Sequence, residues 1–205
     1  MFADKQIKAA AQALLDFDES AHELFEGGSG TPLARAIDLF SKLGDQPEIR
    51  WLSGAVILAG ILRDDDRMTR AGSRMILAHE AATAAKDVIK TEIDRTRPRS
   101  ASRREEKKPK KGRHQAKEMT SFPSGHSAGA AAAALAFSRE YPQLRAGALA
   151  FAGLVAASQV PRRAHYPTDI AAGLVLGFVA EALVDLAWRA ADIDERSDSG
   201  RLERT

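Results

Sequence analysis

The stretch PSGHSAGAAAAALAFS, residues 123–138, opens with a polar turn and continues as a run of alanine. Alanine has the highest intrinsic helix propensity, so we expect a helix over about residues 124–138. Ser124 is suited to cap this helix, because a serine hydroxyl at that position accepts a hydrogen bond from a free amide of the first turn. The segment therefore predicts a helix whose first residues include Gly125 and His126.

On both sides of this segment, helix is expected along nearly the whole chain, because no segment alternates apolar and polar residues as a strand does. The expected helices span about residues 4–25, 31–43, 47–62, 68–97, 124–138, 142–158 and 167–191. A chain of 205 residues suits one hydrophobic core, so residues 1–205 are expected to form a single domain. The fold class predicted is all-α, a bundle of about six or seven helices.

Two charged segments interrupt the helical pattern. A basic loop is expected at residues 99–122, and a flexible charged tail at residues 192–205. The basic surplus between Arg95 and Lys117 is typical of a solvated loop, and it also fits contact with anionic lipid head groups. Nucleic acid is not expected as a partner, because no aromatic residues for base stacking lie among these charges.

The sequence leaves two environments open for the bundle. No stretch reaches eighteen uninterrupted apolar residues, which allows a soluble bundle. Several shorter apolar runs could instead be the middles of membrane spans, since small residues let helices pack closely in lipid. The first twenty residues carry acidic side chains and lack the apolar core of a cleavable signal peptide. We expect a membrane protein, and the sequence does not address its oligomeric state.

A first candidate site is formed by two cations. Lys90 and Arg97 are seven residues apart, which is about two turns of a helix. On the helix expected at residues 68–97 they would share one face and clamp an anion. Taken alone, such a pair is more typical of a solvated helix surface.

The second candidate site is the turn that opens the alanine-rich helix. The free amides at a helix start attract anions, and Gly125 allows a ligand to approach the backbone closely. His126 is placed to give a proton to a leaving oxygen there. An ordinary N-terminal turn explains the segment equally well when it is taken alone.

The third candidate site is His165-Tyr166-Pro167-Thr168-Asp169. Proline suits the first position of a helix, which makes Asp169 the third residue, from where a carboxylate reaches back as in a capping box. We expect it to meet the His165 ring, fix its tautomer and leave the other ring nitrogen free to attack. A capping aspartate with an incidental histidine is the alternative.

Lys-x6-Arg-Pro, Pro-Ser-Gly-His and His-x3-Asp, in this order, resemble the signature of the type-2 phosphatidic acid phosphatase superfamily. That superfamily includes bacterial acid phosphatases, membrane lipid phosphatases and vanadium haloperoxidases. The resemblance runs from Lys90 to Gly173, and the helix pattern extends it to most of the chain. It implies a helical bundle with the active site at one end, in a protein of the bacterial inner membrane.

The resemblance implies a metal-independent phosphatase that works through a phosphohistidine, with His165 as nucleophile, Asp169 orienting it and His126 protonating the leaving oxygen. It further implies phosphate binding by Lys90, Arg97, Ser124 and Gly125. No metal or other cofactor is expected. The substrate is expected to be a lipid or polyprenyl phosphate or another small phosphoester.

One position departs from the family pattern. Gln159 stands where the resemblance implies a phosphate-binding arginine, and a glutamine donates only neutral hydrogen bonds. Arg162 and Arg163 follow in the loop before His165 and are candidates to replace it. The departure keeps a weakened, phosphate- or lipid-binding pseudophosphatase open as the alternative. A haloperoxidase is disfavoured because the chain is short.

Overall fold

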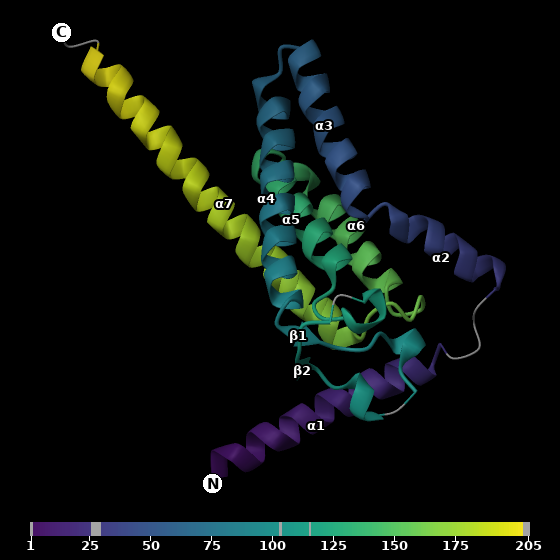
Figure 1. Cartoon of the computed structure of the whole chain (residues 1–205). Coiled ribbons are helices and arrows are strands. Elements are labelled where there is room, and N and C mark those ends of the chain that lie inside the picture. Colours follow the sequence, from purple (N-terminus) through teal and green to yellow (C-terminus); the bar gives the residue numbers. More distant parts are fainter. Residues whose placement is uncertain (1, 26–29, 103, 115, 203–205) are drawn as a thin grey trace.

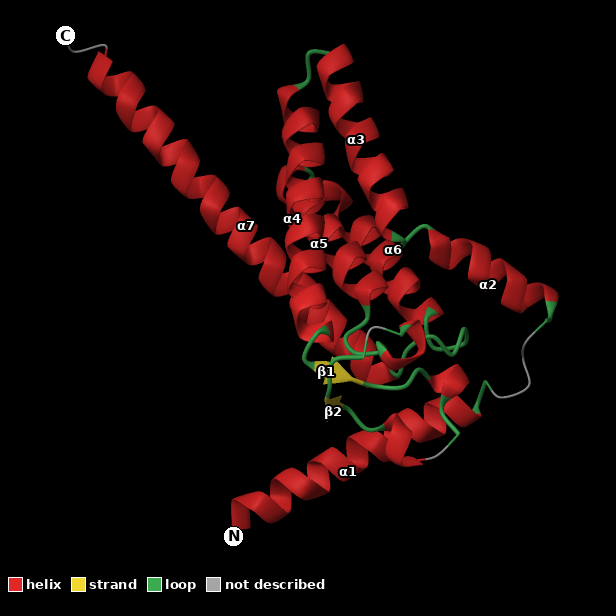
Figure 2. Cartoon of the chain, viewed as in Figure 1, coloured by secondary structure: helices red, strands yellow, loops and turns green. Residues whose placement is uncertain are grey.

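The computed structural model describes residues 2–25, 30–102, 104–114 and 116–202. Helices dominate this part of the chain (Figure 2), which confirms the expected all-α class. The seven α-helices are α1 (Phe2–Glu23), α2 (Pro32–Lys42), α3 (Gln46–Leu62), α4 (Asp66–Lys90), α5 (Gly125–Glu140), α6 (Arg145–Ser158) and α7 (Pro167–Leu202). A small antiparallel sheet pairs β1 (Ile93–Asp94) with β2 (Lys110–Lys111).

The core forms around α5, which packs against α4, α6 and α7, while α3 packs against α4 (Figure 1). Every alanine of α5 is buried, so backbones rather than large side chains meet at its contacts. Small residues at helix contacts are the pattern that lets helices approach closely. At one end of this bundle α1 lies across the sheet and the loops (Figure 1).

Gly173 and Gly177 mark the closest approach between α7 and α5. A Cβ atom at Gly173 would lie 2.4 Å from the carbonyl oxygen of Ser124, and one at Gly177 would lie 2.4 Å from that of Ala128. Both contacts would be with backbone oxygen atoms, which cannot rotate away as a side chain can. These glycines therefore hold the start of α7 against the turn that opens α5.

Replacing Gly173 with alanine should force the two helices apart and lower the free energy of unfolding by about 1–3 kcal/mol, the usual cost of overpacking. The matched control is Gly153→Ala on α6, where a Cβ would meet nothing within 4 Å and helix propensity should raise stability by about 0.5–1 kcal/mol. Thermal unfolding of both variants measures this. Equal stability of the two would contradict the contact.

The helix expected at residues 68–97 is wrong at its end, because α4 stops at Lys90. The chain then forms β1, and Arg97 is extended, with φ −65° and ψ 148°. Proline disfavours helix in the residue before it, so Pro98 keeps Arg97 out of the α conformation. Lys90 and Arg97 therefore do not share a helix face.

The remaining boundaries agree within a few residues, with three differences. The basic loop at residues 99–122 contains β2 and the short 3₁₀ helices Pro98–Ser100, Arg104–Lys107 and Lys117–Met119. The helix expected at residues 142–158 is divided into a 3₁₀ turn, Pro142–Leu144, and α6. Helix α7 continues to Leu202, through much of the tail expected to be flexible, whose last residues, 203–205, lie outside the described part.

In the described part of the chain one helix, Pro167–Ala191 of α7, is long and apolar enough to cross a membrane. Its 25 residues span about 37 Å at the rise of an α-helix, against about 30 Å for a bilayer core. Only 33% of its most apolar window is buried inside the protein. The outward side chains are large and apolar: Leu174, Val175, Phe178, Val179, Leu183 and Leu186.

Candidate active site

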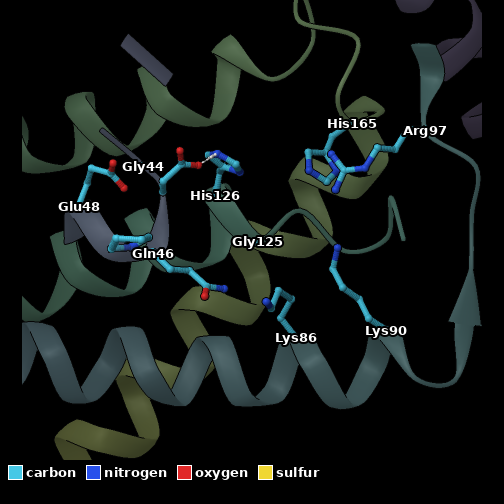
Figure 3. Close-up of a pocket in the computed structure, with 11 residues that line it drawn as sticks. Gly44, Gln46, Glu48, Lys86, Lys90, Arg97, Gly125, His126 and His165 are labelled. Atoms are coloured by element: carbon cyan, nitrogen blue, oxygen red, sulfur yellow. Dashed lines mark ion pairs between the residues drawn. The ribbon is translucent and has the colours of Figure 1, made fainter. Parts of the chain in front are cut away.

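A pocket of about 330 Å³ opens at the end of the bundle where the three motifs meet (Figure 3). One wall is the start of α3 and the turn before it, from Gly44 to Glu48, and another is the last two turns of α4. The functional groups expected from the sequence that line it are Lys90, Arg97, Gly125, His126 and His165. Residues 75 positions apart in the chain, from Lys90 to His165, are thus brought to one cavity.

His165 is buried, with 2% of its surface exposed, just before the start of α7. Its Nδ1 lies 2.7 Å from the carbonyl oxygen of Ser121. A carbonyl can only accept a hydrogen bond, so Nδ1 carries the proton and Nε2 keeps its lone pair. Burial lowers the pKa of His165 to about 4, against the opposing effect of Asp169. The ring is therefore neutral at neutral pH.

Asp169 forms the expected capping box, because its Oδ2 accepts a hydrogen bond from the Tyr166 amide at 2.9 Å. It does not hydrogen-bond the His165 ring, since Oδ2 and Nδ1 are 3.8 Å apart. The Ser121 hydroxyl donates to Asp169 at 2.5 Å, while the Ser121 carbonyl accepts from His165. Ser121 thus stands between the carboxylate and the imidazole, a role that nothing in the motif pattern suggested.

His126 faces His165 from the first turn of α5, with 6.5 Å between the ring centroids. Oδ1 of Asp45 lies 2.5 Å from its Nε2. Burial lowers the pKa of His126, and Asp45 opposes that shift by favouring the imidazolium. Asp45 was not expected from the sequence, because only the fold brings the start of α3 beside the start of α5.

Three cations border the pocket. Lys90 donates to the carbonyl oxygen of Thr120, and burial together with Arg97 and Lys86 lowers its pKa to about 7. The Arg97 Nε donates to the Lys117 carbonyl at 2.8 Å, and burial, helped by the charge of Arg99, lowers its pKa to about 10.

The third cation, Lys86, was missed by sequence reasoning. It lies four residues before Lys90, which places both on one face of α4. This four-residue spacing could have identified Lys86 from the sequence as a neighbour of Lys90. A Cβ at Gly125 would lie 2.9 Å from the Lys86 side chain, so the glycine leaves room for this lysine.

Ser124 is fully buried and caps α5, with its Oγ 3.4 Å from the Ser127 amide. Its own amide donates to the Asp169 carbonyl at 3.0 Å, which ties α5 to α7. Ser124 is not among the residues that line the pocket. In this conformation its hydroxyl serves the helix start.

Gln159, Arg162 and Arg163 also lie outside the pocket lining. The Gln159 amide donates to the Val155 carbonyl at 3.1 Å and accepts from Arg162 at 3.2 Å. Arg162 also binds Asp38 at 2.7 Å. Arg163, with a positive φ of 51°, lines a separate cavity with Arg162 beside α2. None of the three side chains lines the pocket in this structure, although the charge of Arg162 helps to lower the pKa of His126 and of Arg97.

Among the residues that the structure describes, no three His, Asp or Glu side chains gather in a way that could hold a metal ion. The groups of the pocket that can bind an anion are the three cations, the Gly125 amide and the His126 ring when it is protonated. An open pocket bordered by three cations, with a neutral imidazole in its lining, suits a phosphoryl group.

The comparisons with known proteins agree with this geometry. The sequence model of the PAP2 superfamily matches residues 71–191. No curated protein sequence matches the chain. The crystal structure of Aquifex aeolicus LpxE is similar, with a TM-score of 0.58 and 20% identity over 79% of this chain and 92% of that one.

A second similar fold is the crystal structure of the first transmembrane PAP2 type phosphatidylglycerolphosphate phosphatase from Bacillus subtilis. Its TM-score is 0.58, at 24% identity over 92% of this chain and 87% of that one. At this level of identity the two structures share the fold, while the matched sequence model covers more than half of the chain. The chain therefore belongs to the PAP2 superfamily, and the prediction of a phosphatase of that kind is confirmed at the level of the family.

Proposed function

We propose that this protein hydrolyses the phosphate ester or diphosphate of a lipid, at a membrane, by transient phosphorylation of His165. The observation that carries the proposal is the pair of facing imidazoles, His165 and His126, with 6.5 Å between ring centroids in a pocket bordered by cations. That spacing leaves room for a phosphoryl group between a nucleophile on one side and a proton donor on the other.

In the first step the lone pair on Nε2 of His165 attacks phosphorus, and the bond from phosphorus to the leaving oxygen breaks. His126 gives its proton to that oxygen, and Asp45 at its Nε2 favours the protonated ring needed for this. In the second step His126 takes a proton from water, whose oxygen attacks phosphorus. The phosphorus–nitrogen bond then breaks, which returns the pair to His165 and releases inorganic phosphate.

The cations stabilise the charge that collects on the phosphoryl oxygens. Lys90 and Arg97 supply two positive charges, and Lys86 supplies a third from the preceding turn of α4. The Gly125 amide, at the first position of α5, adds a helix N-terminus. Preorganised donors of this kind stabilise a transition state without reorganising during the reaction.

An apolar pocket beside the first one favours a lipid, rather than a small water-soluble ester, as the substrate. One helical turn from Asp45 and His126, Ile49 and Ala130 begin a cavity of about 380 Å³ between α3, α5 and α6. The rest of its lining is apolar, including Leu52, Val56, Phe137 and Phe151. A hydrocarbon chain attached to the phosphate would lie there, because Glu48 lines the first pocket and the next residue, Ile49, lines the second.

The exposed apolar faces of the bundle support a membrane location. Beyond α7, the outer side of α3 exposes Trp51, Leu58 and Leu62. Large exposed apolar surfaces mark contacts with lipid or partners. The two similar structures are an LpxE and a transmembrane PAP2 type phosphatase.

Phosphate release from vesicles that contain a phosphorylated lipid tests the proposal. Hydrolysis of the lipid, well above that of a short-chain phosphoester, is the expected result. Binding of the lipid with no release of phosphate would instead support the pseudophosphatase suggested by Gln159. Quantitative recovery of the protein in a high-speed supernatant without detergent would contradict the membrane location.

The pH dependence of kcat/KM should show that the reaction needs the positive charge of Lys90. Its lowered pKa of about 7 means that the cation is present below pH 7 and is lost as the pH rises through that value. We therefore expect kcat/KM to fall above pH 7, by about tenfold per pH unit. Lys90→Arg should move this decline beyond pH 9, because a guanidinium stays charged.

Lys110→Arg, the same substitution on the exposed strand β2, is the control and should leave the decline in place. A decline near pH 7 that persists in Lys90→Arg would assign it to another group.

A further inference from the structure

We propose that Asp18, on the amino-terminal helix α1, is a positioning residue for the nucleophile and acts through Arg95. The inference rests on the proposed function, since it explains how His165 is held ready to attack. It makes α1 a part of the active site, although Asp18 lies outside the three motifs and Arg95, two residues before the motif arginine, is not a motif position.

Asp18 joins α1 to the start of α7. It is 2% exposed, and its Oδ1 accepts a hydrogen bond from the Thr168 amide at 3.0 Å. Its Oδ2 accepts from the Thr168 hydroxyl at 2.5 Å. The Thr168 amide is one of the free donors of the first turn of α7, where a negative charge is favoured. A carboxylate from another helix thus caps α7 immediately beside Asp169.

Arg95 connects Asp18 to Asp169. It is 1% exposed, and its guanidinium reaches Asp18 at 2.6 Å through Nη2 and Asp169 at 2.5 Å through Nη1. Its Nε donates to the Lys107 carbonyl at 2.7 Å, and its Cζ lies 4.1 Å from the centre of the Tyr166 ring. These contacts fix the guanidinium in one orientation, which only a planar, forked cation can satisfy.

The chain of contacts ends at the nucleophile. Asp169 accepts from the Ser121 hydroxyl, and the Ser121 carbonyl accepts from Nδ1 of His165. The Ser121 amide also donates to the Arg95 carbonyl at 2.9 Å. Arg95 therefore holds Ser121 twice, once through Asp169 and once through the main chain, and Ser121 sets which nitrogen of His165 carries the proton.

Asp18 is expected to position Arg95 because its charge balances that of Asp169 on the other side of the guanidinium. Arg95 is one cation between two buried carboxylates, and a buried charge is held firmly only when its partners are in place. Without the Asp18 charge, Arg95 is drawn toward Asp169 alone, and the carboxylate, Ser121 and the ring shift together. The cations of the pocket do not touch Asp18, so substrate binding should change little.

Asp18→Asn tests this, with Asp64→Asn as the matched control. Asp64 lies in the exposed turn between α3 and α4, at the other end of the bundle, with φ of 50°, which asparagine adopts readily. We expect Asp18→Asn to lower kcat about 10- to 100-fold, the scale of a displaced catalytic group, with KM within about twofold. Asp64→Asn should match the unchanged protein.

The ring itself supplies a readout that is independent of turnover. The ¹⁵N shifts of His165 should show a single tautomer with the proton on Nδ1 in the unchanged protein and a mixture in Asp18→Asn. If no phosphorylated lipid is hydrolysed, the proposed function fails while the ring measurement still tests the coupling. A single Nδ1–H tautomer and unchanged kcat in a folded Asp18→Asn would overturn the proposal.

Arg95→Lys provides the second variant, because one ammonium cannot bridge both carboxylates in the same way. If Asp18 acts through Arg95, the double variant Asp18→Asn, Arg95→Lys should be no slower than Arg95→Lys alone. If the losses in kcat of the two single variants instead multiply in the double variant, the two residues act independently, which contradicts the proposal. Should Asp18→Asn not fold, a mixed His165 tautomer in Arg95→Lys supports the coupling, and a single Nδ1–H tautomer overturns it.

Discussion

His165→Ala is expected to abolish phosphate release, by roughly four powers of ten or more in kcat, while the protein keeps its fold. The loss follows from the removal of the atom that would form the bond to phosphorus. The other imidazole that lines the pocket is His126, and its Nε2 is occupied by Asp45. The measurement is phosphate release from lipid vesicles over long incubation, with helical content as the check on folding.

The control is His114→Ala, since His114 is exposed and lies against Asp94, outside the pocket. It should retain activity close to that of the unchanged protein. Phosphatase activity that survives His165→Ala at an undiminished level would rule out the proposed nucleophile.

Asp169→Asn should be the second most damaging change, with kcat lower by roughly three to four powers of ten and phosphate affinity largely retained. The neutral amide keeps the shape of the carboxylate but not the charge that favours a positive His165 ring during attack. Because Asp169 reaches the ring through Ser121, an amide that donates toward the Ser121 hydroxyl would also disturb the hydrogen bond that sets the tautomer.

Asp18 remains in this variant as a partner for Arg95, so the buried guanidinium keeps one counter-charge. We therefore expect Asp169→Asn to fold, with a reduced melting temperature. Titration with inorganic phosphate separates binding from catalysis. A variant with weakened phosphate affinity and an unchanged rate at saturation would assign Asp169 to substrate binding instead.

The helices could be predicted from the sequence because their signals are local. The alanine run predicted α5, and Ser124 was correctly read as its cap. Proline at the first position predicted the start of α7, including the capping box formed by Asp169. Each of these features depends on residues a few positions apart, which is the range over which periodicity and capping act.

The contacts between distant residues could not be predicted in this way. Asp18 and Arg95 are 77 positions apart, and no periodicity relates a residue on one helix to a partner on another element. The pairing of Asp45 with His126 likewise depends on how α3 packs beside α5. An acidic residue in an amphipathic helix is usually solvated, so Asp18 carried no signal of its burial.

The clamp of Lys90 and Arg97 was predicted for the wrong geometric reason. The two cations do meet in one pocket, but the chain leaves the helix after Lys90 and returns Arg97 from an extended segment. The proline after Arg97 contained the necessary information, since it excludes helix at that arginine. The helical period applies only as far as Lys90, where α4 ends.

Direct detection of phosphorylated His165 tests the central claim. The protein is mixed with a lipid carrying a ³²P-labelled phosphate, stopped in alkaline detergent within milliseconds to seconds, and the labelled peptide is sequenced by mass spectrometry. We expect label that is stable to alkali, lost in acid and located on His165, and no label in His165→Ala. Rapid turnover with label on another residue, or with no label on His165 at any time point, would contradict the mechanism.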